Sequence, residues 1–228
     1  MGWKAQKAQN CYMELCGRVY QSRARLPLPD RWWDPSMLEI TIHGRGGQGV
    51  VVTSRILGTA ALYDGLYAQD FPLYGAARRG APVMAFVRID DKPILLRGYI
   101  AKPDILMLLD ESIIEVKDVF SDLSDDCTII INTTRNTGDF KDAHPEIKDL
   151  RVFCVDGTGI ALEYLKKPIP NVVIIGFLIG ITHLITIDAF KKAVRDELGK
   201  YTEDLVDKNI KGALKAHELV TGAGVTVR

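Results

Sequence analysis

The sequence predicts an α/β fold: a three-layer α/β/α sandwich around a mostly parallel, mixed, Rossmann-like sheet. Short apolar runs recur along the chain, as expected of strands that are covered on both faces. Segments with helical spacing of apolar residues lie between them. A turn inside residues 82–96 indicates a hairpin, which makes the sheet mixed. We expect one domain at 37–228, preceded by an N-terminal appendage at 1–36.

The expected elements follow this alternation. The expected strands are rich in β-branched and apolar residues: 38–43, 82–89, 94–96, 104–109, 127–132 and 152–155. The expected helices repeat apolar residues three or four positions apart: 50–63, 111–123, 159–167, 171–184, 187–198 and 202–220. The segment directly after residue 132 is expected to be a polar loop.

Composition and hydropathy exclude several classes of protein. Lys+Arg and Asp+Glu balance at 29 each, so no basic field favours nucleic acid as a partner. The most apolar run, residues 172–181, is about half the length that a membrane-spanning helix needs, so we expect a buried helix. Residues 1–36 lack the uninterrupted apolar core of a signal peptide. We therefore expect a cytoplasmic protein with no membrane partner.

The cysteines predict no metal site in this chain. Cys11, Cys16, Cys127 and Cys154 form no C-x-x-C pair and no cluster with zinc or iron–sulfur spacing. Cys127 and Cys154 lie at apolar runs, which favours buried free thiols in a reducing compartment.

Residues 1–36 show no sustained period and read as a linker, a partner-binding arm, or translation from an upstream start. Met37 stands directly before the first expected strand and would make an alternative start. Trp32 and Trp33 would either anchor the arm on a neighbouring subunit or cap the domain's own core.

The glycine-rich segment 44–49 is the first candidate site. It fits G-x-G-x-x-G between a strand and a helix, where glycines permit positive φ and close approach, and the helix N-terminus favours an anion. The alternative is that these glycines only let the helix pack tightly on the strand. The predicted binding residues here are Gly44, Arg45, Gly46, Gly47, Gln48 and Gly49.

A dinucleotide site is a narrower interpretation of the same segment. It needs an acidic residue at the end of the second strand to hold a ribose. Asp64 falls in the turn after the helix, and Asp70 precedes Phe71-Pro72 and a loop unlike a Rossmann crossover.

The stretch at residues 68–83 supplies the second candidate site. Arg78 and Arg79 are adjacent and framed by Gly75, Gly80 and Pro82. Two guanidinium groups on a restrained loop suit a phosphate, a carboxylate or a partner's acidic residues. The alternative is a solvated charge pair.

Three ordered motifs resemble a known family. "IHGRGGQGVV", "AQDFPLYGAARRGAPVMAFVRIDDKPI" and "KPDILMLLDES" are similar to the gamma subunit of 2-oxoacid:ferredoxin oxidoreductases, in particular the pyruvate-type enzyme, pyruvate synthase. The resemblance covers residues 37–220 and includes Asn171, Gly176 and Asn209.

The resemblance implies a subunit of an enzyme that converts a 2-oxoacid and CoA to acyl-CoA, CO2 and reduced ferredoxin. Alpha and beta subunits would hold thiamine diphosphate and Mg, and a delta subunit would resemble a ferredoxin with [4Fe-4S] clusters. This chain would hold no catalytic residue and no cofactor alone. Its glycine segment, with Arg78 or Arg79, would help bind the phosphates of coenzyme A or dock the thiamine subunits. The alternatives are an enzyme for aryl or branched 2-oxoacids, or a stand-alone NAD(P)-binding protein.

Other polar residues are expected to be structural. His43 is a possible general base beside the glycines, but a structural histidine is the favoured interpretation, as it is for His183. Residues 110–112 mark a strand end where α/β proteins bind ligands, or form an N-cap.

Overall fold

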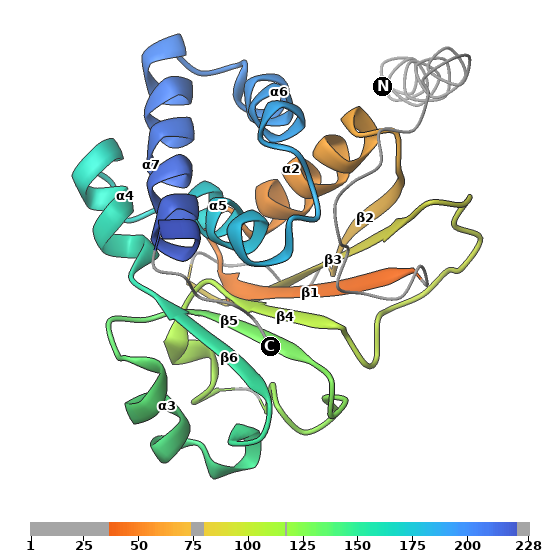
Figure 1. The fold of residues 1–228 in the computed structure, drawn as a ribbon, viewed down its shortest axis with the longest axis vertical. Helices are drawn as coiled ribbons and strands as arrows, with labels where there is room; N and C mark the ends of the chain where they lie inside the picture. Colours follow the sequence, from red (N-terminus) through yellow and green to blue (C-terminus); the bar gives the residue numbers. More distant parts are fainter. Residues whose placement is uncertain (1–36, 74–79, 117, 223–228) are drawn as a thin grey trace. The chain divides into compact units, whose positions relative to one another are not determined.

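The computed structural model describes residues 37–73, 80–116 and 118–222. Their middle layer is a six-stranded sheet in the order β2-β3-β1-β4-β5-β6 (Figure 1). The strands are β1 (Leu38–Arg45), β2 (Tyr67–Leu73), β3 (Pro82–Asp90), β4 (Ile105–Leu108), β5 (Thr128–Asn132) and β6 (Arg151–Val155). Three pairings, from β1 through β4 and β5 to β6, are parallel, whereas β3 is antiparallel to β1 and β2. The predicted α/β fold with a mixed sheet is confirmed.

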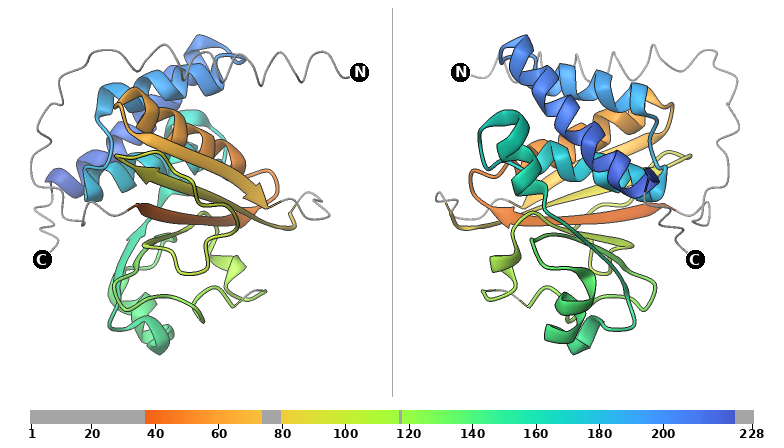
Figure 2. Two further views of the ribbon diagram at one scale, coloured as in Figure 1. Left: turned by 90° about the vertical axis from the view of Figure 1, so that its right-hand side faces the viewer. Right: turned by 60° about the vertical axis from the view of Figure 1, so that its left-hand side comes forward.

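Helices cover the two faces of the sheet unequally (Figures 1 and 2). One face carries α2 (Val50–Tyr63), α4 (Gly157–Leu165), α5 (Asn171–Thr182), α6 (Ile187–Leu198) and α7 (Glu203–Gly222). The other face carries α3 (Thr137–Ala143) and two 3-10 turns, η1 (Glu111–Ile113) and η2 (Pro145–Ile147). The apolar residues accordingly form two cores, one on each side of the sheet.

The alternation of side chains along β4 explains its continuous apolar sequence. Successive side chains of a strand point to opposite faces. Ile105 and Met107 therefore enter the core under the five helices, while Leu106 and Leu108 enter the core under α3. Because both faces are covered, all four positions favour apolar residues.

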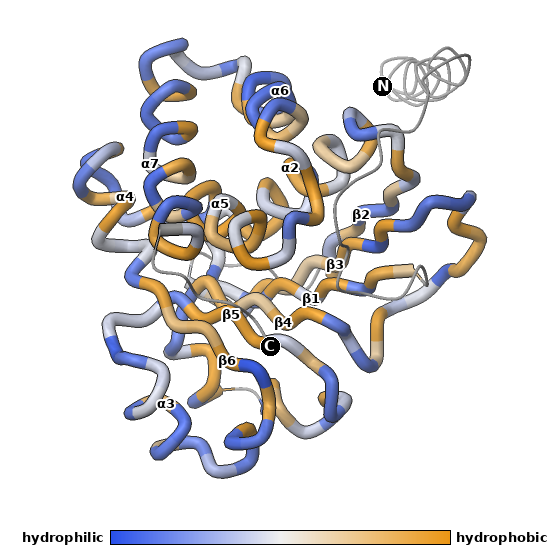
Figure 3. Tube along the Cα trace, in the orientation of Figure 1, coloured by the Kyte–Doolittle hydropathy of each residue, from blue (hydrophilic) through white to orange (hydrophobic). Residues whose placement is uncertain are grey.

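The helix α5 is the buried helix that the sequence predicts. All its residues are buried, and Figure 3 shows its apolar trace beside the mixed trace of α7. A Cβ atom on Gly176 would lie 2.1 Å from the carbonyl oxygen of Ala213 on α7, so only glycine permits this approach. No helix in the described ranges is both long and apolar enough to cross a membrane.

Two expected elements are wrong. The described residues of the segment 111–123 form η1, turns and irregular structure, and Ile113 and Val119 pack in the second core from these turns. Asp and Ser residues within it favour turns over helix because they bond to the local backbone. The segment 94–96 is no strand, and the exposed fraction of Leu95 is 88%. The hairpin is formed by β2 and β3 instead.

Two elements were missing from the expectation. β2 is a half-buried edge strand that contains Pro72, a residue that edge strands tolerate but that weakens the strand pattern. The polar segment after residue 132 contains α3, whose N-cap Asn136 accepts a hydrogen bond from the Asp139 amide.

Candidate functional site

The carboxyl end of β1 turns into α2 through the glycine turn, residues 44–49. Gly47 and Gly49 have φ angles of 101° and 81°, in the left-handed region that favours glycine. A Cβ atom on Gly44 would lie 2.7 Å from Cγ2 of Val50. The glycines of the sequence pattern therefore stand where the strand-to-helix turn needs a positive φ or a close approach.

The turn is fastened to the start of β3. The Gly46 amide donates to the Ala81 carbonyl at 2.8 Å, and the Gly46 carbonyl accepts from the Gly80 amide at 3.1 Å. These bonds continue the β1–β3 ladder beyond its last paired residues. The position of the turn is therefore fixed by the sheet as well as by its own glycines.

Arg45 links the turn to the segment after β4. Its Nε donates to Ser112 Oγ at 2.7 Å, and its Nη2 donates to the Ser112 carbonyl at 3.1 Å. Its Nη1 donates to the Gly80 carbonyl at 3.1 Å, and Asp110 lies 3.8 Å from Nε. The predicted role of Arg45 as an anion ligand stays a prediction, but its guanidinium already contacts these protein acceptors.

Gln48 and Asp110 complete this network. Gln48 accepts from the Arg45 amide at 2.7 Å and donates to Asp110 at 2.6 Å, while Asp110 also caps η1 through the Ser112 amide. Burial alone would raise the pKa of Asp110. Hydrogen bonds from Ser112 and Gln48 and the charge of Arg45 outweigh burial, so this pKa lies below its ordinary value. Asp110 is therefore an ionised anchor of the turn.

The N-terminus of α2 offers hydrogen-bond donors at the turn. Its N-cap Gly49 provides no side-chain cap. Within the described ranges, no acceptor pairs with the amides of Val50, Val51 or Val52. Free amides and the positive end of the helix dipole suit an anion.

The sequence did not single out Asn171 as a site residue, although it belongs to the site. It is the first residue of α5 and lies against Gly49, and its exposed fraction is 4%. The available signal was a polar residue at the start of a long apolar helix. The turn thus joins the N-termini of two helices, α2 and α5.

The other candidate residues lie apart from the turn or have structural contacts. Asp70 lies against Gly58, nine residues and thus about 13 Å along α2 from Gly49. Because β3 separates β2 from β1, Asp70 does not occupy the ribose position of a Rossmann fold. Asp64 bonds to Thr186 at the start of α6.

The two histidines occupy structural positions. His43 is buried on β1, and His183 has left-handed backbone angles at the C-cap of α5. Arg78 and Arg79 lie outside the described residues, as does the appendage at 1–36. In the ranges that are described, no three His, Cys, Asp or Glu side chains are grouped to hold a metal ion.

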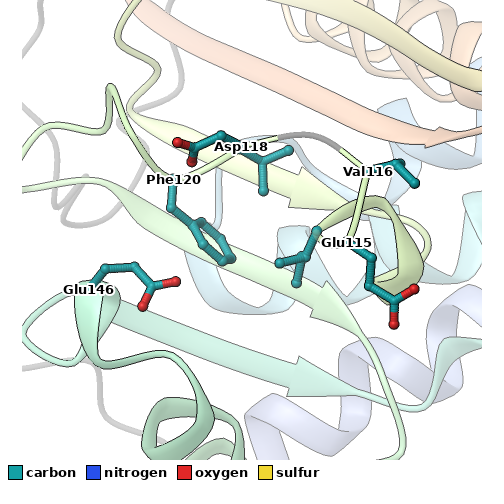
Figure 4. A pocket seen from close by; sticks show the side chains of 7 residues that line it. Glu115, Val116, Asp118, Phe120 and Glu146 are labelled. Atoms are coloured by element: carbon teal, nitrogen blue, oxygen red, sulfur yellow. The ribbon is translucent and has the colours of Figure 1, made fainter.

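A hollow beyond η1 has a different character (Figure 4). Glu115, Asp118 and Glu146 line it together with Val116 and the ring of Phe120. Three carboxylates repel a phosphate group, so this hollow does not extend the anion site.

The fold and the turn define the class of protein: an α/β domain with an anion-compatible helix N-terminus at the carboxyl edge of its sheet. The model of the pyruvate ferredoxin/flavodoxin oxidoreductase family matches residues 39–219. The chain belongs to this family of oxidoreductases. The gamma-subunit resemblance seen in the sequence is thereby confirmed.

Individual relatives agree with the family model. Pyruvate synthase subunit PorC of Methanothermobacter thermautotrophicus is 45% identical over 183 residues, 80% of this chain and 95% of that protein. The common subunit gamma of the pyruvate/ketoisovalerate oxidoreductases of Pyrococcus furiosus is 40% identical over 182 residues, 80% and 96% of the two chains.

A solved relative has the same fold. The crystal structure of pyruvate oxidoreductase subunit PORC from Thermotoga maritima superimposes with a TM-score of 0.69 at 31% identity. The match covers 80% of this chain and 96% of that one.

Proposed function

We propose that the chain is the gamma subunit of a pyruvate-type 2-oxoacid:ferredoxin oxidoreductase, which forms acyl-CoA, CO2 and reduced ferredoxin. The observation that carries the proposal is the 45% identity to a pyruvate synthase subunit over 95% of that subunit's length. Alpha and beta subunits would hold thiamine diphosphate and Mg, and a delta subunit would hold [4Fe-4S] clusters. This chain would contribute no catalytic residue.

The glycine turn is proposed to contact the phosphates of coenzyme A in that complex. Its uncapped helix N-terminus and free amides support this role, because they match the acceptor oxygens of a phosphate. Arg78 and Arg79 are proposed as the cations of the same site. The rival proposal is that the turn and the arginine loop only dock an alpha or beta subunit.

The complex is proposed to work in the cytoplasm. The thiols of Cys127 and Cys154 are free, which is compatible with a reducing compartment. Burial raises the pKa of Cys127 to about 12, so this thiol is expected to be unreactive.

A second substrate class has a specific observation in its favour. The Pyrococcus furiosus relative is described as common to pyruvate and ketoisovalerate oxidoreductases. The same gamma chain would then serve a second enzyme for branched 2-oxoacids.

Purification tests the subunit proposal. A tagged copy of the full chain should co-elute from its host with a thiamine diphosphate subunit and a brown iron–sulfur subunit. The eluted complex should reduce ferredoxin when both pyruvate and CoA are present. A monomer that binds NADH tightly and has no such partners would overturn the proposal. Pyruvate and 2-ketoisovalerate, supplied separately, would distinguish the two substrate classes.

The CoA role is tested by Arg78→Ala in the assembled complex. The KM for CoA should rise while the complex still assembles. Loss of assembly with normal CoA kinetics in the remaining complex would favour docking instead. An unchanged KM together with normal assembly would remove Arg78 from the proposed site.

A further inference from the structure

Two helix N-termini without side-chain caps come together at the glycine turn. Gly49 is the N-cap of α2, Pro170 is the N-cap of α5, and neither helix receives a side-chain cap. A Cβ atom on Gly49 would lie 2.5 Å from Nδ2 of Asn171, the first residue of α5. The absence of a side chain at Gly49 thus lets the Asn171 amide lie directly at the N-terminus of α2.

The Asn171 side chain lacks a hydrogen-bond partner among the residues that the structure describes, although its exposed fraction is only 4%. Other amides of this kind are bonded: Asn132 Nδ2 donates to the Leu109 carbonyl at 2.9 Å, and Asn209 Nδ2 donates to the Leu205 carbonyl at 2.8 Å. The Asn171 amide is not among the described buried atoms that lack both a partner and solvent contact, so it keeps a small contact with solvent at the turn. A nearly buried N–H donor that has no protein acceptor and can still be reached from solvent is available to a ligand, because polar groups in such positions are usually bonded.

The surroundings of Asn171 indicate the chemistry of that ligand. No acceptor in the described part of the chain pairs with the amides of residues 50–52 or 171–173. The nearby acceptors are occupied, because the Gly46 carbonyl accepts from Gly80 and the Gly49 carbonyl accepts from Thr53. The place where the helices meet thus presents donors and two positive dipole ends, which favours an anion.

We propose that the Asn171 amide and the joined N-termini of α2 and α5 form one binding site for a phosphoryl group. The inference rests on the phosphate role proposed for the glycine turn and extends it to α5. The contrasting role is packing alone, in which Asn171 only fills the space above Gly49. An apolar side chain would fill that space equally well, and every other residue of α5 from Val172 to Ile181 is apolar or glycine.

Thermal unfolding of the full chain with inorganic pyrophosphate as the probe tests the site without the complex. A ligand that binds only the folded state raises the melting temperature, and the rise grows with the logarithm of the ratio of ligand concentration to Kd. Asn171→Asp keeps the shape of the side chain and replaces its N–H donor by an acceptor. Asn171→Ala removes the donor without adding a charge and serves where the aspartate variant does not fold.

The matched control is Asn136→Asp at the N-cap of α3. It makes the same chemical change at another helix N-terminus, and it shares any general stabilisation of the fold by a multivalent anion. We expect pyrophosphate to stabilise the wild type and the control alike. Both Asn171 variants should bind it about tenfold or more weakly, as expected for loss of a hydrogen bond to a charged ligand.

The inference would be overturned if pyrophosphate stabilised Asn171→Ala as much as the wild type. It would also be overturned if pyrophosphate stabilised the wild type no more than chloride does at equal ionic strength. The assembled complex then identifies the source of the phosphoryl group. If it belongs to CoA, Asn171→Ala raises the KM for CoA but leaves the KM for pantetheine, which has no phosphate, unchanged. An unchanged KM for CoA, with pyrophosphate binding lost, would reject CoA as the ligand while retaining the site.

Discussion

At the end of β1, glycines take backbone angles that other residues avoid, whereas in the contact between α5 and α7 a glycine makes room for a neighbouring helix. Gly47 has a φ of 101° and no atom within 4 Å of the position of a Cβ. Gly176 has ordinary helical geometry, but a Cβ would lie 2.1 Å from the backbone of α7. Gly49 combines both features, because its φ is 81° and its Cβ position meets Asn171.

The two regions also differ in what holds them together. The α5–α7 contact consists of apolar side chains and close backbone approach, while the turn depends on hydrogen bonds among Arg45, Gln48, Asp110 and Ser112. A substitution in the helix contact should therefore change the stability of the whole domain. A substitution at the turn should cause a smaller loss of stability and a larger change in ligand binding.

Gly176→Ala should have the largest effect. The new methyl group would contact the Ala213 carbonyl, and backbone cannot move aside unless α5 and α7 separate. We expect the free energy of unfolding to fall by about 3 kcal/mol, the upper end of the range for overpacked cores. Urea unfolding followed by circular dichroism measures this loss.

Gly212→Ala is the control for Gly176→Ala. It lies on α7 in the same contact, but its Cβ would meet side chains and no backbone, the nearest being Val173 at 3.3 Å. Alanine also has a higher helix propensity than glycine by about 1 kcal/mol. The variant should retain the wild-type stability, and a loss equal to that of Gly176→Ala would contradict the distinction between backbone and side-chain contact.

Gly49→Ala should have the next largest effect. An alanine in the left-handed region costs about 1–2 kcal/mol, and here the methyl group would also displace Asn171. Gly47→Ala should show the backbone cost alone, because nothing lies near its Cβ position. We compare both variants with the Gly49→Ala/Asn171→Ala double variant by denaturant unfolding. This comparison measures how much of the stability lost in Gly49→Ala comes from the clash with Asn171. If the double variant recovers no stability relative to the sum of the single variants, Asn171 does not supply the clash.

Arg45→Ala should lower the free energy of unfolding by about 2 kcal/mol, since the Ser112 and Gly80 acceptors lose a charged donor. Arg45→Lys should recover only a small part of this loss. A single ammonium group cannot reproduce the planar guanidinium, whose separate N–H groups donate to Ser112 and to Gly80 at once. Chemical unfolding of the two variants gives the comparison, and full recovery by lysine would mean that charge alone holds the turn.

The sequence predicts the turn better than it predicts the contacts made by the turn. The glycine spacing between a strand and a helix indicates the local backbone, because φ preferences and helix dipoles act within a few residues. The bonds from Arg45 to Ser112 join residues 67 positions apart, and no local pattern indicates them. The place of Asn171 at the turn was not predicted for the same reason, since it depends on how α5 packs against α2.

The errors in the predicted elements have a similar origin. Residues 171–182 are apolar on every side, and a helix buried on all sides follows directly from that composition. Residues 111–123 also show helical spacing, yet Ile113 and Val119 are buried through irregular turns under the sheet. β2 was missed because an edge strand is half-buried along its length and lacks a clear alternation.

Asp110→Asn should have the smallest effect on stability, and its pH dependence identifies the cause. The pKa of Asp110 in the folded chain lies below its ordinary value of 3.8. Its ionised form therefore stabilises the fold fully above pH 3.8, and this contribution disappears as the pH falls through the lower, folded value. At pH 7 we expect a loss of about 1 kcal/mol, mainly because the hydrogen bond from Gln48 is disrupted.

Asp104 provides a control for this last prediction, because its pKa is shifted in the opposite direction and its contribution to stability should change with pH in the opposite way. Burial raises its pKa, so any stability that it contributes is present at low pH and is lost as the pH rises through the folded value. On acidification below pH 3.8, the difference in unfolding free energy between wild type and Asp110→Asn should shrink. As the pH rises towards neutral, Asp104→Asn should gain stability relative to wild type. Urea titrations at a series of pH values measure both differences. A pH-independent loss in Asp110→Asn would mean that shape, and not the charge shared with Arg45, makes this carboxylate the anchor of the turn.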